Sequence, residues 1–115
     1  DAQPGESSEA MRARVIKARE AQQHRFAEYN TTAQKPIHCN AQMTPKLVRE
    51  YCVLDAAGDK LLSYAMDKMG LSARAYDRIL KVARTIADLD GSDAIQVVHI
   101  SEAISYRSLD REDWV

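Results

Sequence analysis

Apolar residues recur at every third or fourth position over most of the chain, the spacing that places side chains on one face of an α-helix. The first stretch follows Pro4 and Gly5, where Ser7 or Ser8 can cap a helix and Glu9 adds the negative charge favoured near an N-terminus. One stripe then comprises Met11, Val15, Ala18, Gln22, Phe26 and Tyr29. This pattern predicts a long amphipathic helix whose apolar face has one polar interruption, Gln22.

The other faces of this first helix carry mixed charge. Basic residues alternate there with Glu20 and Glu28: Arg12, Arg14, Lys17, Arg19 and Arg25. Such interleaving is typical of a solvated helix face. The alternative is a face that contacts DNA, and its signature would be binding that weakens steeply with salt.

A polar loop is predicted over residues 30–42, which contain Pro36 and lack a sustained period. A short helix should follow, because Thr44 offers a cap and Pro45 a first-turn proline ahead of the apolar Leu47, Val48 and Tyr51. Asp55 can cap a third helix, in which Leu61, Leu62, Ala65, Met66 and Met69 repeat at helical spacing. Gly70 then offers a left-handed stop.

Ser72 can cap a fourth helix, whose predicted stripe is Ala75, Ile79, Val82, Ala83, Ile86 and Leu89. After a turn at residues 90–92, the stretch from Ile95 to Val98 is expected to be briefly extended. A last helix should hold Ile100, Ala103 and Ile104, and residues 108–115 should form a polar tail. Short connections between amphipathic helices predict an all-α fold, a small bundle of four to five helices.

Length and composition fit one compact, water-soluble domain. The chain has 115 residues, 45% of them hydrophobic and 29% charged. Sixteen Lys and Arg against seventeen Asp and Glu give a net charge of -1, so no domain-wide positive field attracts nucleic acid. Two cysteines without a paired framework, a polar N-terminus and the lack of a long apolar run lead us to expect a cytoplasmic protein without membrane contact.

No residue set in the sequence has the spacing of an autonomous catalytic or metal site. The candidate metal ligands, which lie on separate predicted elements, are His24, His38, Cys39, Cys52 and His99. We expect His38 and Cys39 to lie in a solvated loop and Cys52 to pack as a small apolar group. The glycines are Gly5, Gly58, Gly70 and Gly91, too isolated to form a phosphate-binding loop. The chain alone is therefore expected to have no catalytic residue, metal or cofactor.

Arg74 stands out because it lies in the first turn after Ser72, where the helix dipole disfavours a cation. A helix N-terminus attracts anions, and a guanidinium adds a bidentate donor beside the free N–H groups, which would suit a phosphate sensor. Arg78 and Lys81 continue on the same face, although Asp77 can pair with Lys81. The alternative for Arg74 is an exposed or locally paired arginine.

Several runs of sequence resemble the C-terminal region of the magnesium chelatase-like AAA-plus ATPases of the ComM/YifB type. These runs are GESS at 5–8, VIKAR at 15–19, GLSARAY at 70–76, RIL at 78–80, VARTIADL at 82–89 and EAISYR at 102–107. The resemblance covers nearly the whole chain, which begins with Asp rather than Met. It implies a helical lid domain over residues 8–107, a linker over residues 1–7 from an ATPase core not included here, and a tail over residues 108–115.

The resemblance also implies a role for the unusual arginine. In this family the lid lies beside the nucleotide, and the sensor-2 arginine corresponds to Arg74, with Ser72 and Arg78 as weaker flanking candidates. For the full-length protein it implies ATP and magnesium as ligands, a ring of neighbouring subunits, and DNA branch migration during natural transformation. Alternatives are a subunit-interaction module in which Arg74 pairs with a partner's carboxylate, and the lid of a metal-insertion chelatase subunit.

Overall fold

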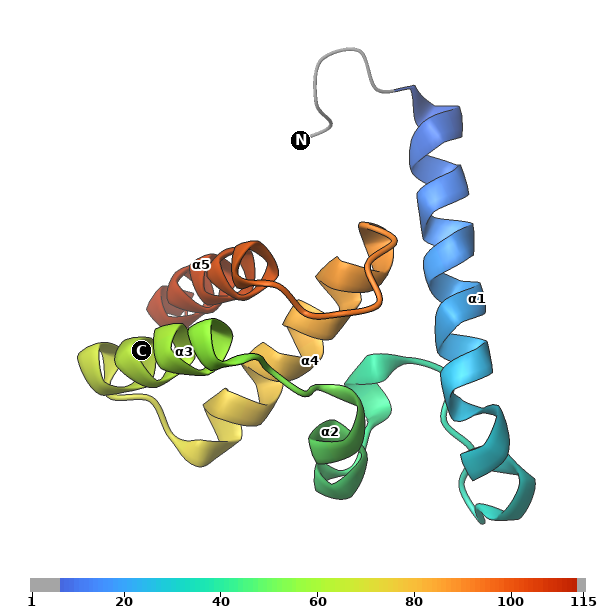
Figure 1. Cartoon of the computed structure of the whole chain (residues 1–115), viewed down its shortest axis with the longest axis horizontal. Coiled ribbons are helices and arrows are strands. Elements are labelled where there is room, and N and C mark those ends of the chain that lie inside the picture. Colours follow the sequence, from blue (N-terminus) through green and yellow to red (C-terminus); the bar gives the residue numbers. More distant parts are fainter. Residues whose placement is uncertain (1–6, 114–115) are drawn as a thin grey trace.

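The computed structural model describes residues 7–113, and side chains are described for residues 7–106. This part of the chain contains five α-helices and one short 3-10 turn, η1, and one isolated parallel bridge joins Leu54 to Ile95 (Figure 1). The elements are α1 (Ser8–Thr32), η1 (Asn40–Gln42), α2 (Pro45–Tyr51), α3 (Ala56–Met69), α4 (Ala73–Leu89) and α5 (Val97–Asp113). The predicted all-α fold is confirmed.

The helix ends follow local capping chemistry. Four side chains predicted as caps accept a hydrogen bond from a backbone N–H three residues later: Ser7 from Ala10 at 3.0 Å, Thr44 from Leu47 at 3.3 Å, Asp55 from Gly58 at 2.7 Å and Ser72 from Ala75 at 3.2 Å. Helix α3 ends at Gly70, whose φ of 61° lies in the left-handed region that glycine enters without steric cost.

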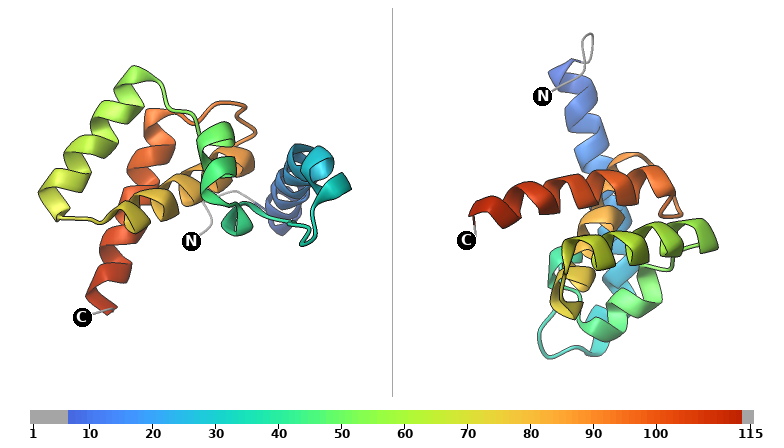
Figure 2. Two further views of the ribbon diagram at one scale, coloured as in Figure 1. Left: turned by 90° about the horizontal axis from the view of Figure 1, so that it is seen from below. Right: turned by 90° about the vertical axis from the view of Figure 1, so that its left-hand side faces the viewer.

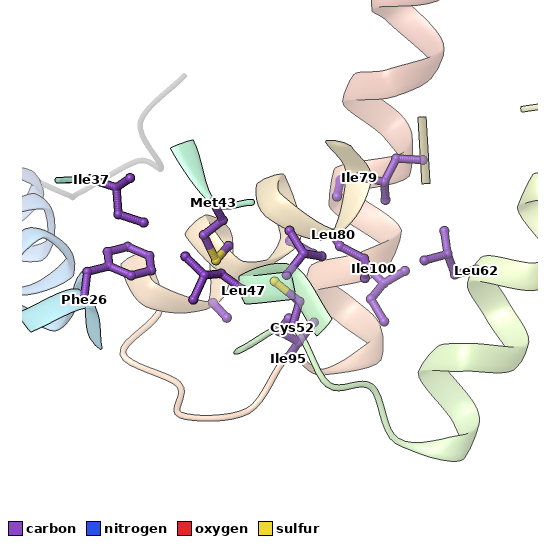
Figure 3. Packing of buried hydrophobic residues seen from close by; sticks show 14 residues of the cluster. Phe26, Ile37, Met43, Leu47, Cys52, Leu62, Ile79, Leu80, Ile95 and Ile100 are labelled. Atoms are coloured by element: carbon purple, nitrogen blue, oxygen red, sulfur yellow. The ribbon is translucent and has the colours of Figure 1, made fainter. Parts of the chain in front are cut away.

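Helix α4 is the centre of the fold. It packs against α1, α2, η1 and α5, while α3 packs against α5 (Figures 1 and 2). A continuous apolar cluster extends from Phe26 on α1 through Met43 and Leu47 to Ile100 and Leu62 (Figure 3). Cys52 belongs to this cluster, so its predicted packing as a small apolar group is confirmed.

The predicted apolar stripe of α4 is only partly correct. Ala75, Ile79 and Ala83 are buried, but Val82 is 38% exposed, while Arg84 and Asp88 are only 4% and 5% exposed. The side of α4 that contacts Arg25 of α1 and Asn40 of η1 therefore carries the buried charges of Arg84 and Asp88.

The Asp88 carboxylate gathers these charges into a buried cluster. The two Arg25 terminal nitrogens donate to its oxygens at 2.7 and 2.9 Å, Asn40 Nδ2 donates at 2.8 Å, and Arg84 lies 3.2 Å away. Arg84 also donates to the carbonyls of Ser92 and Asp93. Burial lowers the pKa of Arg84, and the Asp88 charge opposes that shift.

The prediction of a polar loop over residues 30–42 is only partly correct, and the expectation of a solvated Arg25 is wrong. Helix α1 extends to Thr32, and Asn40 is completely buried, where its backbone N–H donates to Gln22 Oε1 at 3.0 Å. Gln22, the polar interruption of the stripe, is thus buried with a partner. Arg25 leaves the solvated face because Asp88 supplies a buried carboxylate in reach. His38 and Cys39 are exposed, as predicted.

One expectation near the C-terminus also needs correction. Only Ile95 is extended, and α5 begins at Val97 because Gln96 and His99 form a hydrogen-bonded turn there. The backbone of α5 remains helical to Asp113, so residues 108–113 of the predicted polar tail continue that helix. Residues 1–6 of the predicted linker lie outside the described residues.

Gly58→Ala should destabilise the domain. Helix propensity alone predicts a gain of about 1 kcal/mol. A Cβ at this position would, however, lie 2.7 Å from Ile100 Cδ1 and 3.1 Å from the capping Asp55 Oδ1. Overpacking of this kind costs about 1–3 kcal/mol, so we expect a lower free energy of unfolding in urea. The double variant Gly58→Ala with Ile100→Val, which lacks the Cδ1 atom, should recover part of the lost stability. A Gly58→Ala protein that is more stable than the original would contradict the close approach.

Asp88→Ala should cost about 3–5 kcal/mol of unfolding free energy, because it leaves the Arg84 guanidinium buried without a carboxylate. Asp67→Ala, at an exposed position of α3, is the control and should change stability by less than about 0.5 kcal/mol. Urea titration followed by helical circular dichroism measures both. Equal effects would mean that the cluster does not stabilise the fold.

Candidate functional site

The first turn of α4 combines an exposed arginine with free helix N–H groups. Ser72 is the N-cap, and its hydroxyl and carbonyl accept from the N–H groups of Ala75 and Tyr76. The N–H groups of Ala73 and Arg74 precede the first intrahelical hydrogen bond, which leaves them pointing out of the helix end. Arg74 is exposed. The buried Asp88 carboxylate is paired with Arg25 and Arg84, not with Arg74. The arrangement suits a negatively charged group approaching from outside the domain.

The other two basic residues of this face differ from each other. Arg78, one turn further along α4, is exposed, whereas Lys81 is half-buried and its Nζ donates to the carbonyl of Ala41 at 3.3 Å. Lys81 therefore links α4 to η1. The sequence indicated a pairing of Lys81 with Asp77 and gave no sign of this contact. Of the predicted basic stripe, Arg74 and Arg78 remain as surface cations.

The candidate metal ligands do not converge. Between residues 7 and 106, no three His, Cys, Asp or Glu side chains come close enough together to hold a metal ion. Cys39 is exposed and Cys52 buried, and burial raises the pKa of the Cys52 thiol to about 11. Such a thiol remains protonated and unreactive at neutral pH.

A groove that the sequence analysis missed lies between α1, α4 and α5. It has a volume of about 1020 Å³, and its walls include Met11 from α1, Val82 and Ile86 from α4, and Val98 and Tyr106 from α5. The predicted stripe of α1 hinted at this groove, because Met11 and Val15 continue the face of Ala18, Gln22 and Phe26. Met11 and Val15 are 38% and 39% exposed, whereas the other three are buried.

His99 holds the α4–α5 edge of the groove in place. The backbone N–H of Gln96 donates to His99 Nδ1 at 2.9 Å, so this nitrogen carries no proton. The proton of the neutral ring is then on Nε2, which lies 2.9 Å from Asp90 Oδ2. One imidazole thus links the start of α5 to the turn after α4, which is a structural role for a candidate metal ligand.

None of the helices described has the length and apolarity needed to span a bilayer.

Comparison with known proteins places these features in a family. The family described as magnesium chelatase, subunit ChlI C-terminal, matches residues 5–107. YifB of Escherichia coli (strain K12) is 42% identical over 108 residues, which cover 94% of this chain and 19% of that protein. The competence protein ComM of Haemophilus influenzae is 40% identical over 107 residues, covering 93% of this chain and 19% of its own length.

A more distant relative, an uncharacterized protein of Mycobacterium tuberculosis (strain ATCC 25618 / H37Rv), is 33% identical over 90% of this chain. The chain spans about a fifth of the length of the curated relatives that it matches. The family match covers most of the residues that form the five helices, including the whole of α4. The chain therefore belongs to the magnesium chelatase ChlI C-terminal family, in a form similar to that of YifB and ComM.

Proposed function

We propose that this domain is the helical lid of an AAA-plus ATPase and that Arg74 is its sensor-2 arginine. The single observation that supports this role most directly is the position of Arg74, exposed in the first turn of α4 beside backbone N–H groups that precede the helical hydrogen-bond ladder. A cation is unfavourable at that end of a helix unless an anion joins it. A nucleotide phosphate is an anion that would offset this cost.

In this role the residues of the α4 start have separate tasks. The Arg74 guanidinium donates to phosphate oxygens and stabilises the negative charge that develops on them. Ser72 maintains the helix end by capping Ala75, and it is a positioning residue rather than a ligand. Arg78, four residues after Arg74, adds positive charge on the same side of α4. ATP with magnesium would be bound by a core domain outside this chain and would supply the phosphoryl group.

Phosphate contact also gives the lid a mechanical task. The lid adopts a closed position while Arg74 contacts the terminal phosphate, and loss of that phosphate releases it, which is a shift between two populations. The proposal extends to the full-length protein: a ring of cytoplasmic subunits in which the lid contacts the upstream core and neighbouring subunits. The expected output is a motor acting on DNA, as in branch migration during competence; the relative ComM of Haemophilus influenzae is a competence protein.

Arg74→Ala should lower ATP hydrolysis by the longer protein at least about tenfold, the factor that corresponds to 1.4 kcal/mol of lost transition-state stabilisation. In the isolated domain the same change should alter the free energy of unfolding by less than about 0.5 kcal/mol, because Arg74 is exposed. Steady-state hydrolysis and urea unfolding measure the two effects.

Arg49→Ala is the matched control, because Arg49 is an exposed arginine in the last turn of α2. It should leave hydrolysis unchanged. Unaltered hydrolysis by the Arg74 variant together with a broken oligomer would refute the sensor role and favour the subunit-interaction role.

A further inference from the structure

We propose that the groove between α1, α4 and α5 is the docking surface for the polypeptide that precedes this region in longer members of the family, and that this polypeptide binds in cis. The inference rests on one part of the proposed function, the assignment of this domain to a longer chain. It does not depend on a nucleotide role for Arg74.

The first argument is the apolar stripe of α1. The C-terminal part of this stripe, Ala18, Gln22 and Phe26, is buried against the bundle. In the N-terminal part, Met11 and Val15 on the same face are over one third exposed. No residue between Ser8 and Lys17 is buried. In Figure 1 this half of α1 extends past the other helices. A helical segment of this length is marginal in water unless it packs on something, so the stripe indicates a missing contact.

The second argument is that the opposite walls of the groove are also apolar. Val98 on α5 is 60% exposed, Tyr106 is 49% exposed, and Val82 on α4 is 38% exposed. These side chains lie on two helices yet face one groove with Met11 of α1. A docking segment would bury all of them at once, as an amphipathic helix does in an apolar groove.

The third argument concerns the polar groups of the groove, which are already occupied. Lys81 donates to Ala41, Thr85 to the Lys81 carbonyl, and the Tyr106 hydroxyl to Glu102 at 3.0 Å. His99 is engaged by both of its ring nitrogens. A small polar ligand would find few groups to orient it here, whereas an apolar protein surface needs none.

The position of α1 favours a segment of the same polypeptide over a second copy. The relatives are about five times longer than the matched region, and the family describes a C-terminal part, so the additional length precedes it. The chain enters the domain through the N-terminal end of α1, and Met11 on the first turns of α1 is one wall of the groove. A preceding segment is thereby tethered close to its binding surface at high effective concentration.

Thiol accessibility tests the inference. Val98→Cys introduces a reporter in the groove, and Val53→Cys places one on the connection between α2 and α3, where Val53 is 69% exposed. Both are made with Cys39→Ser, because Cys39 is the exposed native thiol; the pKa of about 11 keeps Cys52 unlabelled. Labelling rates with a maleimide are compared between the 115-residue chain and the longer protein that contains it.

We expect labelling at position 98 to slow by at least about tenfold in the longer protein, independently of protein concentration, while labelling at position 53 does not change. Equal rates at position 98 in the two proteins, or equal protection at both positions, would overturn the proposal. Protection that grows with concentration, in either protein, would identify a second copy as the occupant and would also overturn it. Loss of hydrolysis in Arg74→Ala is a separate result, so the two proposals can fail independently.

Discussion

The Asp88 carboxylate is the interaction on which the arrangement of the helices depends. It is almost completely buried, and its oxygens accept from Arg25 on α1 and from Asn40 in η1, while Arg84 completes the cluster from α4 itself. A buried carboxylate is stable only when its hydrogen-bond partners are all present. These partners lie on three segments, so α1 and η1 must assume their positions on α4 together. Apolar contacts such as those of Phe26 attract α1 to the core but allow α1 more than one orientation. The bidentate contact of Arg25 with Asp88 allows only one orientation.

Capping chemistry made the helix ends predictable from the sequence. Ser7, Thr44, Asp55 and Ser72 each act on an N–H group three residues away, and the left-handed stop at Gly70 is equally local. Such interactions are encoded within one turn, so a single sequence contains all the information needed. The position of Arg74 in the first turn of α4 follows from the same rule. Its nucleotide role, with those of Ser72 and Arg78, came from family resemblance and stays a prediction.

Long-range polar pairing could not be predicted. Arg25 and Asp88 are 63 positions apart, and a charged residue on a mixed helix face gives no sign of its partner. The same limitation applies to Asn40, which looked like a loop residue, and to Val82, whose exposure depends on where α1 and α5 leave space. Periodicity correctly identified α4 as amphipathic, but the buried face is rotated from the predicted stripe because Arg84 and Asp88 are buried there while Val82 is exposed. The β-branched pair Val97 and Val98 suggested an extended segment, although the turn stabilised by His99 begins a helix there.

Helix α4 joins the exposed Arg74 to the buried Asp88 cluster. Its 17 residues correspond to about 25 Å at 1.5 Å per residue, with Arg74 near the first end and the Asp88 cluster near the last. Because Arg25 and Asn40 fix α1 and η1 to that second end, a tilt of α4 caused by an anion at Arg74 would carry α1 with it instead of sliding past it. The exposed half of α1 forms a wall of the groove, so the same tilt would move that wall together with α4. A rigid polar joint between α4 and α1 would therefore allow a phosphate contact at one end of the domain to reposition a docking surface at the other.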